Sequence, residues 1–202
     1  MGVATALVAV RDLDLDAELV ERHRAGDLRA FDEVYDRFGR MVYNLALRLA
    51  GNREEAADLT QETFLRIFRH LGGFAGRSAL KTWIFRIALN HCRERLFRRS
   101  IETLSLDEEG ETESTLLADP ARGPEELALA ADERRRVAEG LSRLPHAYRE
   151  AVVLRDLEGL SYDEIAEVLG IRVGTVRSRI ARGRDQLRLQ LEKEGHEPTL
   201  EQ

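Results

Sequence analysis

The stretch SYDEIAEVLGIRVGTVRSRIARGRDQLRL, residues 161–189, predicts two short helices joined by a tight turn. Ser161 can cap the first helix, and Glu164 stands three residues later, where a capping box requires it. Gly170 lies where that helix must end and the chain must turn, a position that favours glycine. Val176 and Ile180 then recur at helical spacing as the buried face of a second helix. This pattern is typical of a helix-turn-helix.

The second of these helices is rich in arginine. Six arginines and a single acidic residue, Asp185, lie between Ile171 and Arg188. In a DNA-binding helix-turn-helix the second helix enters the major groove, where arginine pairs with guanine and with phosphates. The segment therefore favours binding to duplex DNA, although a basic helix on a protein surface can also be no more than a solvated face.

Charge is distributed unevenly along the chain. The net charge of its 202 residues is −6, which is unusual for a nucleic-acid-binding protein. Residues 74–99, however, hold seven Lys or Arg and one acid, whereas residues 101–127 hold nine acids and one Arg. The total thus conceals two basic surfaces separated by an acidic segment. Because 34% of the residues are charged, 6% are aromatic and no strand-like alternation occurs, we expect an all-α fold.

The composition disfavours several classes of function. Cys92 is the only cysteine, so no internal disulfide can form, which fits a reducing cytoplasm. We expect no metal or other cofactor, because the adjacent His91 and Cys92 would diverge on a helix. An enzyme is disfavoured since no nucleophile–base pair and no Gly-rich phosphate loop is evident. The apolar residues 3–10 are too few to span a bilayer, and we expect residues 1–13 to form a disordered leader.

Residues 14–100 are expected to form a four-helix domain. A short helix over residues 16–25 precedes a long helix that Asp27 can cap and that ends at Gly51. Asn52 can cap a third helix, which ends before Gly72. This third helix carries polar residues at one-turn spacing, and they form either a binding stripe or an ordinary solvated face: Asp58, Gln61, Glu62 and Arg66.

The fourth helix, predicted over residues 79–99 with Ser78 as its cap, is both basic and aromatic. Since arginine can bind phosphates, and aromatic rings or an amide can hold unstacked bases, this helix suits single-stranded DNA. Trp83 can equally be a packing residue that anchors the preceding loop, residues 74–78, to the helix. The basic, aromatic and amide residues involved are Lys81, Trp83, Phe85, Arg86, Asn90, Arg93, Arg95, Phe97, Arg98 and Arg99.

Residues 101–127 interrupt the helical pattern. They are rich in Glu, Asp, Ser and Thr, a composition that buries too little apolar surface to fold. We therefore expect a flexible acidic linker there, then a second four-helix domain over residues 128–191, and a flexible tail over residues 192–202. In the second domain, helices are predicted over residues 130–144 and 146–157, ahead of the helix-turn-helix.

Three stretches together resemble a known family. They are AFDEVYDRFGRMVYNLALRLAGNREEAADLTQETFLRIFRHL at residues 30–71, FAGRSALKTWIFRIALNHCRERLFRR at 74–99, and LSRLPHAYREAVVLRDLEGLSYDEIAEVLGIRVGTVRSRIARGRDQLR at 141–188. In this order and with this gap they resemble the extracytoplasmic-function (ECF) group of sigma-70 family sigma factors. The resemblance implies two helical domains, of the sigma-2 and sigma-4 types, in a protein that binds core RNA polymerase and directs initiation without being an enzyme.

The resemblance also assigns roles to residues of this sequence. It implies contact with the clamp helices of the polymerase β′ subunit by Asp58, Gln61, Glu62 and Phe64. It implies that the promoter −10 element is melted and held, with a flipped non-template base near the loop and Asn90. The residues implied in this role are Phe74, Arg77, Ser78, Trp83, Arg86, Asn90 and Arg93. It implies that the second domain packs on the β flap and recognises the −35 element as duplex DNA. The residues implied in this recognition are Thr175, Arg177, Ser178, Arg179 and Arg182.

Further expectations concern partners and regulation. The resemblance implies regulation by a separate anti-sigma factor and a role in a stress response. We expect a cytoplasmic protein, without membrane insertion and without a small-molecule substrate. We expect the free protein to be compact, with its DNA surfaces partly masked by the acidic linker or a partner. Arg172 departs from the family, which often has proline there, and the single Trp83 replaces the paired aromatics of housekeeping sigma factors. The alternative is a stand-alone helix-turn-helix regulator that acts without polymerase, although no apolar dimer stripe is evident.

Overall fold

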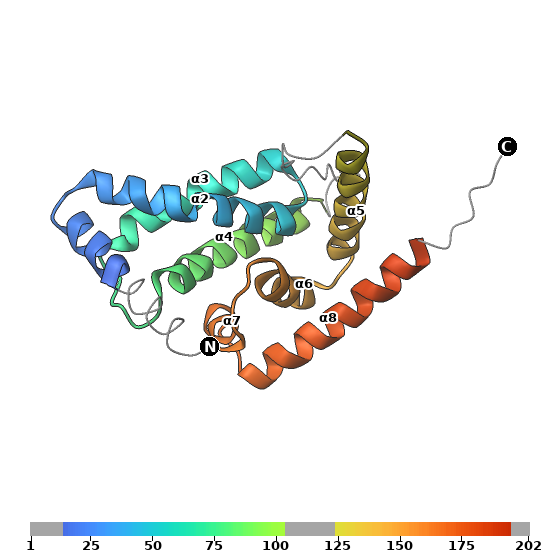
Figure 1. Cartoon of the computed structure of the whole chain (residues 1–202). Helices are drawn as coiled ribbons and strands as arrows, with labels where there is room; N and C mark the ends of the chain where they lie inside the picture. Colours follow the sequence, from blue (N-terminus) through green and yellow to red (C-terminus); the bar gives the residue numbers. More distant parts are fainter. Residues whose placement is uncertain (1–13, 104–123, 195–202) are drawn as a thin grey trace.

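The computed structural model describes residues 14–103 and 124–194, and these ranges contain helices and turns but no strand (Figure 1). The predicted all-α fold is therefore confirmed for the part of the chain that the structure describes. The predicted leader and most of the predicted linker and tail lie outside these ranges.

A helix over residues 14–24 and three longer helices build the N-terminal half: α2 (Leu28–Ala50), α3 (Arg53–Leu71) and α4 (Leu80–Thr103). Two predicted caps are confirmed. The Asp27 carboxylate accepts a hydrogen bond from the Arg29 backbone N–H at 3.0 Å, and Asn52 Oδ1 accepts from the N–H of Glu54 at 2.8 Å. Apolar residues at helical spacing form the core between these helices: Val34, Phe38, Leu45, Ile67, Ile84, Phe85 and Leu89.

The start of α4 differs from the prediction that Ser78 caps it. Ala79 immediately precedes the helix, and its carbonyl accepts from the Trp83 N–H at 3.1 Å. The N–H of Leu80, which has no partner within the helix, donates to Asp16 Oδ2 at 3.0 Å. A side chain 64 residues earlier in the sequence thus caps this helix, and no local pattern could indicate such a contact.

The C-terminal half contains α5 (Pro124–Ser142), α6 (His146–Val152), the π-helical turn η1 (Val153–Leu157), α7 (Tyr162–Leu169) and α8 (Val173–Glu194). Helix α5 begins inside the segment that was predicted to be linker. The helix predicted over residues 146–157 changes to π geometry at Val153, where the Glu158 N–H donates to the Val153 carbonyl at 3.0 Å.

The helix-turn-helix is formed by α7 and α8, as predicted. Ser161 and Glu164 make the capping box, with hydrogen bonds of 3.2 and 2.7 Å between each side chain and the other's backbone N–H. Gly170 ends α7 with a φ of +66°, in the left-handed region that residues with a Cβ rarely adopt. Val176 and Ile180 are buried, which fixes α8 on the rest of this half.

The two halves pack against each other. Helix α4 contacts α7, and α2 contacts both α5 and η1, so that α4 lies between the N-terminal helices and α6–α7 (Figure 1). The described residues thus form a compact body, in agreement with the expectation of a closed free protein. None of the described helices has the length and apolarity needed to cross a bilayer.

Candidate nucleic-acid interface

The exposed face of α8 carries the residues predicted to bind duplex DNA. Arg177, Ser178 and Arg182 are exposed, while Thr175 and Arg179 are half-buried. The Arg177 guanidinium lies 5.8 Å from the centre of the Tyr162 ring. Across residues 14–103 and 124–194, Arg179 and Arg182 have no acidic partner, so their charges are available to an external anion.

The loop predicted to bind the −10 strand lies beside the helix over residues 14–24. Phe74 is buried and packs on Trp83 edge to face, with ring centres 5.4 Å apart, which agrees with a packing role for Trp83. Arg77 is exposed, and Ser78 is half-buried. A cavity of about 360 Å³ opens between this loop and the helix, lined by Asp16, Ala17, Val20, Glu21, Arg24, Phe74, Ala75, Gly76 and Ser78.

Two predicted −10 residues on α4 face acidic residues of the C-terminal half. Nε and Nη2 of Arg93 donate to the two carboxylate oxygens of Glu150 at 2.7 and 2.6 Å, and these bonds raise the pKa of Arg93. Nη1 of Arg86 lies 4.0 Å from a carboxylate oxygen of Glu167. Carboxylates of the C-terminal half therefore lie against two of the guanidinium groups that were predicted to bind the −10 element. Asn90, on the same helix, is exposed and does not line the cavity beside the loop.

Buried charges join the two halves at a second place. Arg48 pairs with Glu158, whose side chains are 17% and 5% exposed. Burial raises the pKa of Glu158 and lowers that of Arg48, and the attraction between them opposes both changes. Arg149 is buried and donates to the carbonyls of Leu49 at 3.3 Å and Leu144 at 3.1 Å. Burial also lowers the pKa of Arg149, so these contacts desolvate charge in the closed arrangement.

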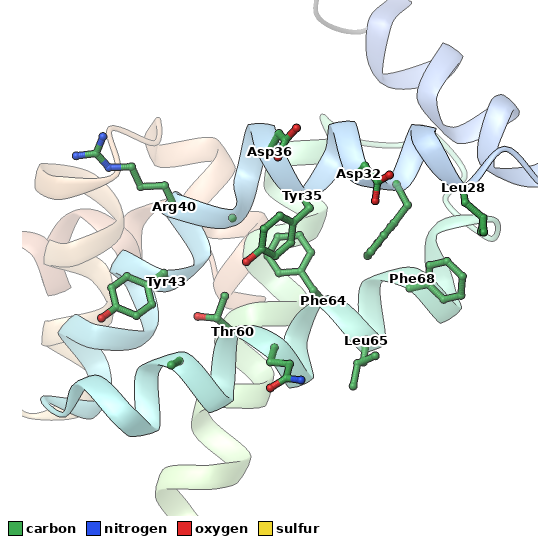
Figure 2. Close-up of a pocket in the computed structure, with 14 residues that line it drawn as sticks. Leu28, Asp32, Tyr35, Asp36, Arg40, Tyr43, Thr60, Phe64, Leu65 and Phe68 are labelled. Carbon is green, nitrogen blue, oxygen red and sulfur yellow. The ribbon is translucent and has the colours of Figure 1, made fainter.

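The polar stripe predicted on α3 is exposed beside an apolar groove. Asp58, Gln61 and Glu62 are exposed, and Phe64 is buried at 4% exposure. Figure 2 shows the groove between α2 and α3, where the Tyr35 ring faces that of Phe64. Its volume is about 1080 Å³, and the large apolar side chains that it leaves open to solvent are those of Leu28, Tyr35, Leu65 and Phe68.

Two family models match the chain, one in each half. The model described as Sigma-70 region 2 matches residues 34–101, and the one described as Sigma-70, region 4 matches residues 134–187. The RNA polymerase sigma-H factor of Pseudomonas aeruginosa is 38% identical over 174 residues, which cover 84% of this chain and 90% of that protein. The ECF RNA polymerase sigma-E factor of Haemophilus influenzae is 37% identical over 177 residues, with 85% and 93% covered. The chain belongs to the ECF group of RNA polymerase sigma factors.

Solved structures agree with this family. The structure of CnrH in complex with the cytosolic domain of CnrY has 28% sequence identity to this chain and a TM-score of 0.67. The match covers 89% of this chain and 99% of that one. The fold is shared by the sigma factor RpoE in complex with the anti-sigma factor NepR from Bartonella quintana. That structure has 23% identity and a TM-score of 0.67, over 80% of this chain and 96% of that one.

The predicted family and function are thus confirmed. This protein is an alternative sigma factor, which works with RNA polymerase as a regulator of transcription initiation at promoters.

His91 connects the stripe on α3 to the core of the sigma factor. Its ring is buried, with Nε2 2.9 Å from Glu62 Oε2 and Nδ1 3.0 Å from the Thr63 hydroxyl. Burial lowers the pKa of His91, and the nearby Arg66 lowers it further. The His91 ring therefore links the exposed carboxylate of Glu62 to the buried hydroxyl of Thr63.

Several residues of these sites were missed in the sequence. From the helix over residues 14–24, Arg24 contacts Phe74 of the loop and Asp16 contacts Leu80 at the start of α4. Glu150 and Glu158 pair with arginines of the other half. Glu150 did offer a signal, because it lies at helical spacing with the buried face of α6 yet is charged. An ionisable residue on a core-facing position generally requires a partner.

Proposed function

We propose that the sigma factor uses three separate surfaces for three contacts. The α2–α3 groove and the adjacent stripe bind core polymerase, the loop over residues 74–78 with α4 holds the melted −10 strand, and α8 binds the −35 duplex. The observation that carries this proposal is that Arg177 and Arg182 of α8 and the apolar groove are open to solvent, whereas Arg93 and Arg86 of α4 face carboxylates of the C-terminal half.

The groove suits a helical partner such as the clamp helices of the β′ subunit. It lies along α2 and α3, is lined largely by apolar side chains, and carries Asp32, Asp36 and Arg40 on its α2 side (Figure 2). An amphipathic helix with basic residues beside its apolar face would bury the four open apolar side chains of the groove. Gln61 and Leu65 line this surface from α3, and Asp58 and Glu62 lie on the same helix.

The cavity beside the −10 loop suits one extruded base. Its volume of about 360 Å³ exceeds that of a nucleobase, and it combines an apolar floor at Val20 and Phe74 with the polar Ser78. Arg77, which is exposed on the same loop, would bind the adjoining phosphate.

Release of Arg93 and Arg86 from their acidic partners must accompany binding to the strand. Polymerase binding separates the two halves, the −35 domain contacts the β flap, and the two arginines then meet phosphates. An anti-sigma factor, as bound by the sigma factor RpoE of Bartonella quintana, would favour the inactive state. The chain would act in the cytoplasm, where polymerase and promoter meet, and in response to stress.

Transcription in vitro with core polymerase tests this proposal. Arg179→Ala should cost about 1–3 kcal/mol of binding at the −35 element. It should leave initiation on a premelted template that lacks a −35 element unchanged. Arg188→Ala is the matched control, because Arg188 lies on the same helix and pairs with Glu192 at 3.0 Å. Equal effects of the two substitutions would overturn the −35 assignment.

Variants of the groove test the polymerase surface. Leu65→Asp places a charge in the apolar groove and should weaken binding to core polymerase, whereas Glu54→Ala, in the exposed first turn of the same helix, should not. If the protein with Leu65→Asp bound core polymerase as the wild type does, the groove would not be the contact. A chain that bound promoter DNA tightly as a dimer and never required polymerase would be a stand-alone regulator instead.

A further inference from the structure

The helix over residues 14–24 precedes the segment that the region 2 family model matches, yet it contacts both Phe74, where the −10 loop (residues 74–78) begins, and Leu80, where α4 begins after it. No functional role was predicted for this helix from the sequence. Its contacts reach the end of α3, the loop and the start of α4.

Arg24 holds the first part of the loop. Its Nε donates to the Gly72 carbonyl at 2.6 Å, and its Nη2 donates to the Phe74 carbonyl at 2.8 Å. One guanidinium thus fixes two backbone carbonyls that are two residues apart, a geometry that its planar fork favours. On the same helix, His23 Nε2 lies 3.2 Å from the Phe68 carbonyl at the end of α3.

Asp16 holds the start of α4, two residues after the loop. Its side chain is 5% exposed, and its two carboxylate oxygens have different partners. Oδ2 accepts from the backbone N–H of Leu80 at 3.0 Å, and Oδ1 accepts from Arg37 Nη1 at 2.8 Å. Because the carboxylate caps α4, it fixes the direction in which the helix leaves the loop.

Between these two anchors the loop is exposed. Ala75, Gly76 and Arg77 are open to solvent, and Gly76 has a φ of +65°. The same helix lines the cavity beside the loop through Asp16, Ala17, Val20, Glu21 and Arg24. The shape of the cavity therefore depends on the anchors as well as on the loop itself.

We propose that the helix over residues 14–24 is a brace that holds the −10 loop in the shape that accepts an extruded base, with Arg24 and Asp16 as positioning residues. The inference rests on the proposed role of the loop in −10 recognition. A loop held in its binding conformation loses less conformational freedom when the strand binds, and it presents one cavity shape instead of many. The brace thereby sets selectivity among bases, rather than affinity for polymerase.

The test is a selectivity ratio measured with the full chain and core polymerase. Transcripts made with the wild-type chain first identify a promoter and the −10 base on which it depends. Open-complex formation on this promoter is then divided by that on a promoter with this base replaced. If the wild-type ratio is close to one, the proposed −10 function has itself failed, which is a separate outcome from failure of the brace.

Arg24→Ala should lower this ratio by about tenfold, the scale of one charge-assisted hydrogen bond, while binding to core polymerase remains unchanged. Arg24→Lys, which can reach one carbonyl but not both, should restore part of the ratio. Arg22→Ala is the matched control, since Arg22 lies on the same helix and pairs with Asp27 and Glu33 instead of the loop.

Asp16 provides an independent variant. Asp16→Asn keeps an oxygen that can accept from Leu80, so it should preserve more of the ratio than Asp16→Ala does. A ratio that stays at the wild-type value in Arg24→Ala would overturn the proposal. So would an equal fall in initiation on both promoters, because a merely structural role lowers the amount of active protein without changing its choice of base.

Discussion

The ion pair between Arg93 and Glu150 is predicted to keep the sigma factor closed. Glu150→Gln removes the charge while nearly preserving the size of the side chain, so it weakens this contact without leaving a cavity. Because Arg93 is also proposed to hold the −10 strand, the substitution should strengthen the binding of single-stranded −10 DNA by the free protein. Carboxylate and phosphate compete for the same guanidinium.

The size of this effect follows from the burial of the pair. The Glu150 side chain is 7% exposed and that of Arg93 is 39% exposed. Hydrogen bonds to a charged group contribute about 1.5–3 kcal/mol each, and breaking a fully buried pair costs about 3–5 kcal/mol. Solvent at the arginine reduces this value, so we expect about 1–2 kcal/mol in favour of the open state. The apparent affinity for the strand should then rise about 5–30-fold, provided that the closed state predominates in the wild type.

Fluorescence anisotropy with a labelled −10 oligonucleotide, at one fixed salt concentration, measures this rise. Glu192→Gln is the control, because it removes the same charge from an exposed pair with Arg188 that lies within α8. An unchanged affinity in Glu150→Gln would refute the reasoning. An equal rise in both variants would also refute it, since net charge alone would then explain the effect.

Three further predictions concern stability and reactivity. Gly183→Ala would place a Cβ 2.6 Å from Val152 Cγ2 and should destabilise the chain by about 1–3 kcal/mol in thermal unfolding, whereas Gly174→Ala, in open space, should not. Cys92 is buried and its pKa is raised to about 12, so iodoacetamide should modify it only as fast as the protein opens, as mass spectrometry can follow. The lowered pKa of His91 means that the unfolded chain binds more protons below about pH 6.5. Urea denaturation should therefore show stability falling as the pH drops through this range, with a smaller slope in His91→Gln.

The helices and their local caps could be predicted from the sequence because the signals are local. Asp27, Asn52 and Ser161 each accept from N–H groups two or three residues away, and Gly170 has the backbone angle that its position required. Such contacts depend on spacing alone.

Contacts between distant segments could not be predicted in the same way. Asp16 caps α4 from 64 residues earlier in the sequence, and Glu150 pairs with Arg93 from 57 residues later. Composition placed residues 101–127 in the linker, but α4 extends to Thr103 and α5 begins at Pro124, because proline is well tolerated in the first turn of a helix. We expected the acidic linker or a partner to mask the DNA-binding surfaces, and most of that linker lies outside the described residues. Within the described residues, Glu150 and Glu167 of the C-terminal half cover Arg93 and Arg86.

Sequencing the 5′ ends of transcripts made from genomic DNA by core polymerase with this chain tests the central claim most directly. The account predicts discrete start sites that share a −10 and a −35 element at a constant spacing. In Arg179→Ala, only the −35 element should lose its influence on where transcription starts. Transcripts indistinguishable from those of core polymerase without the chain would contradict it.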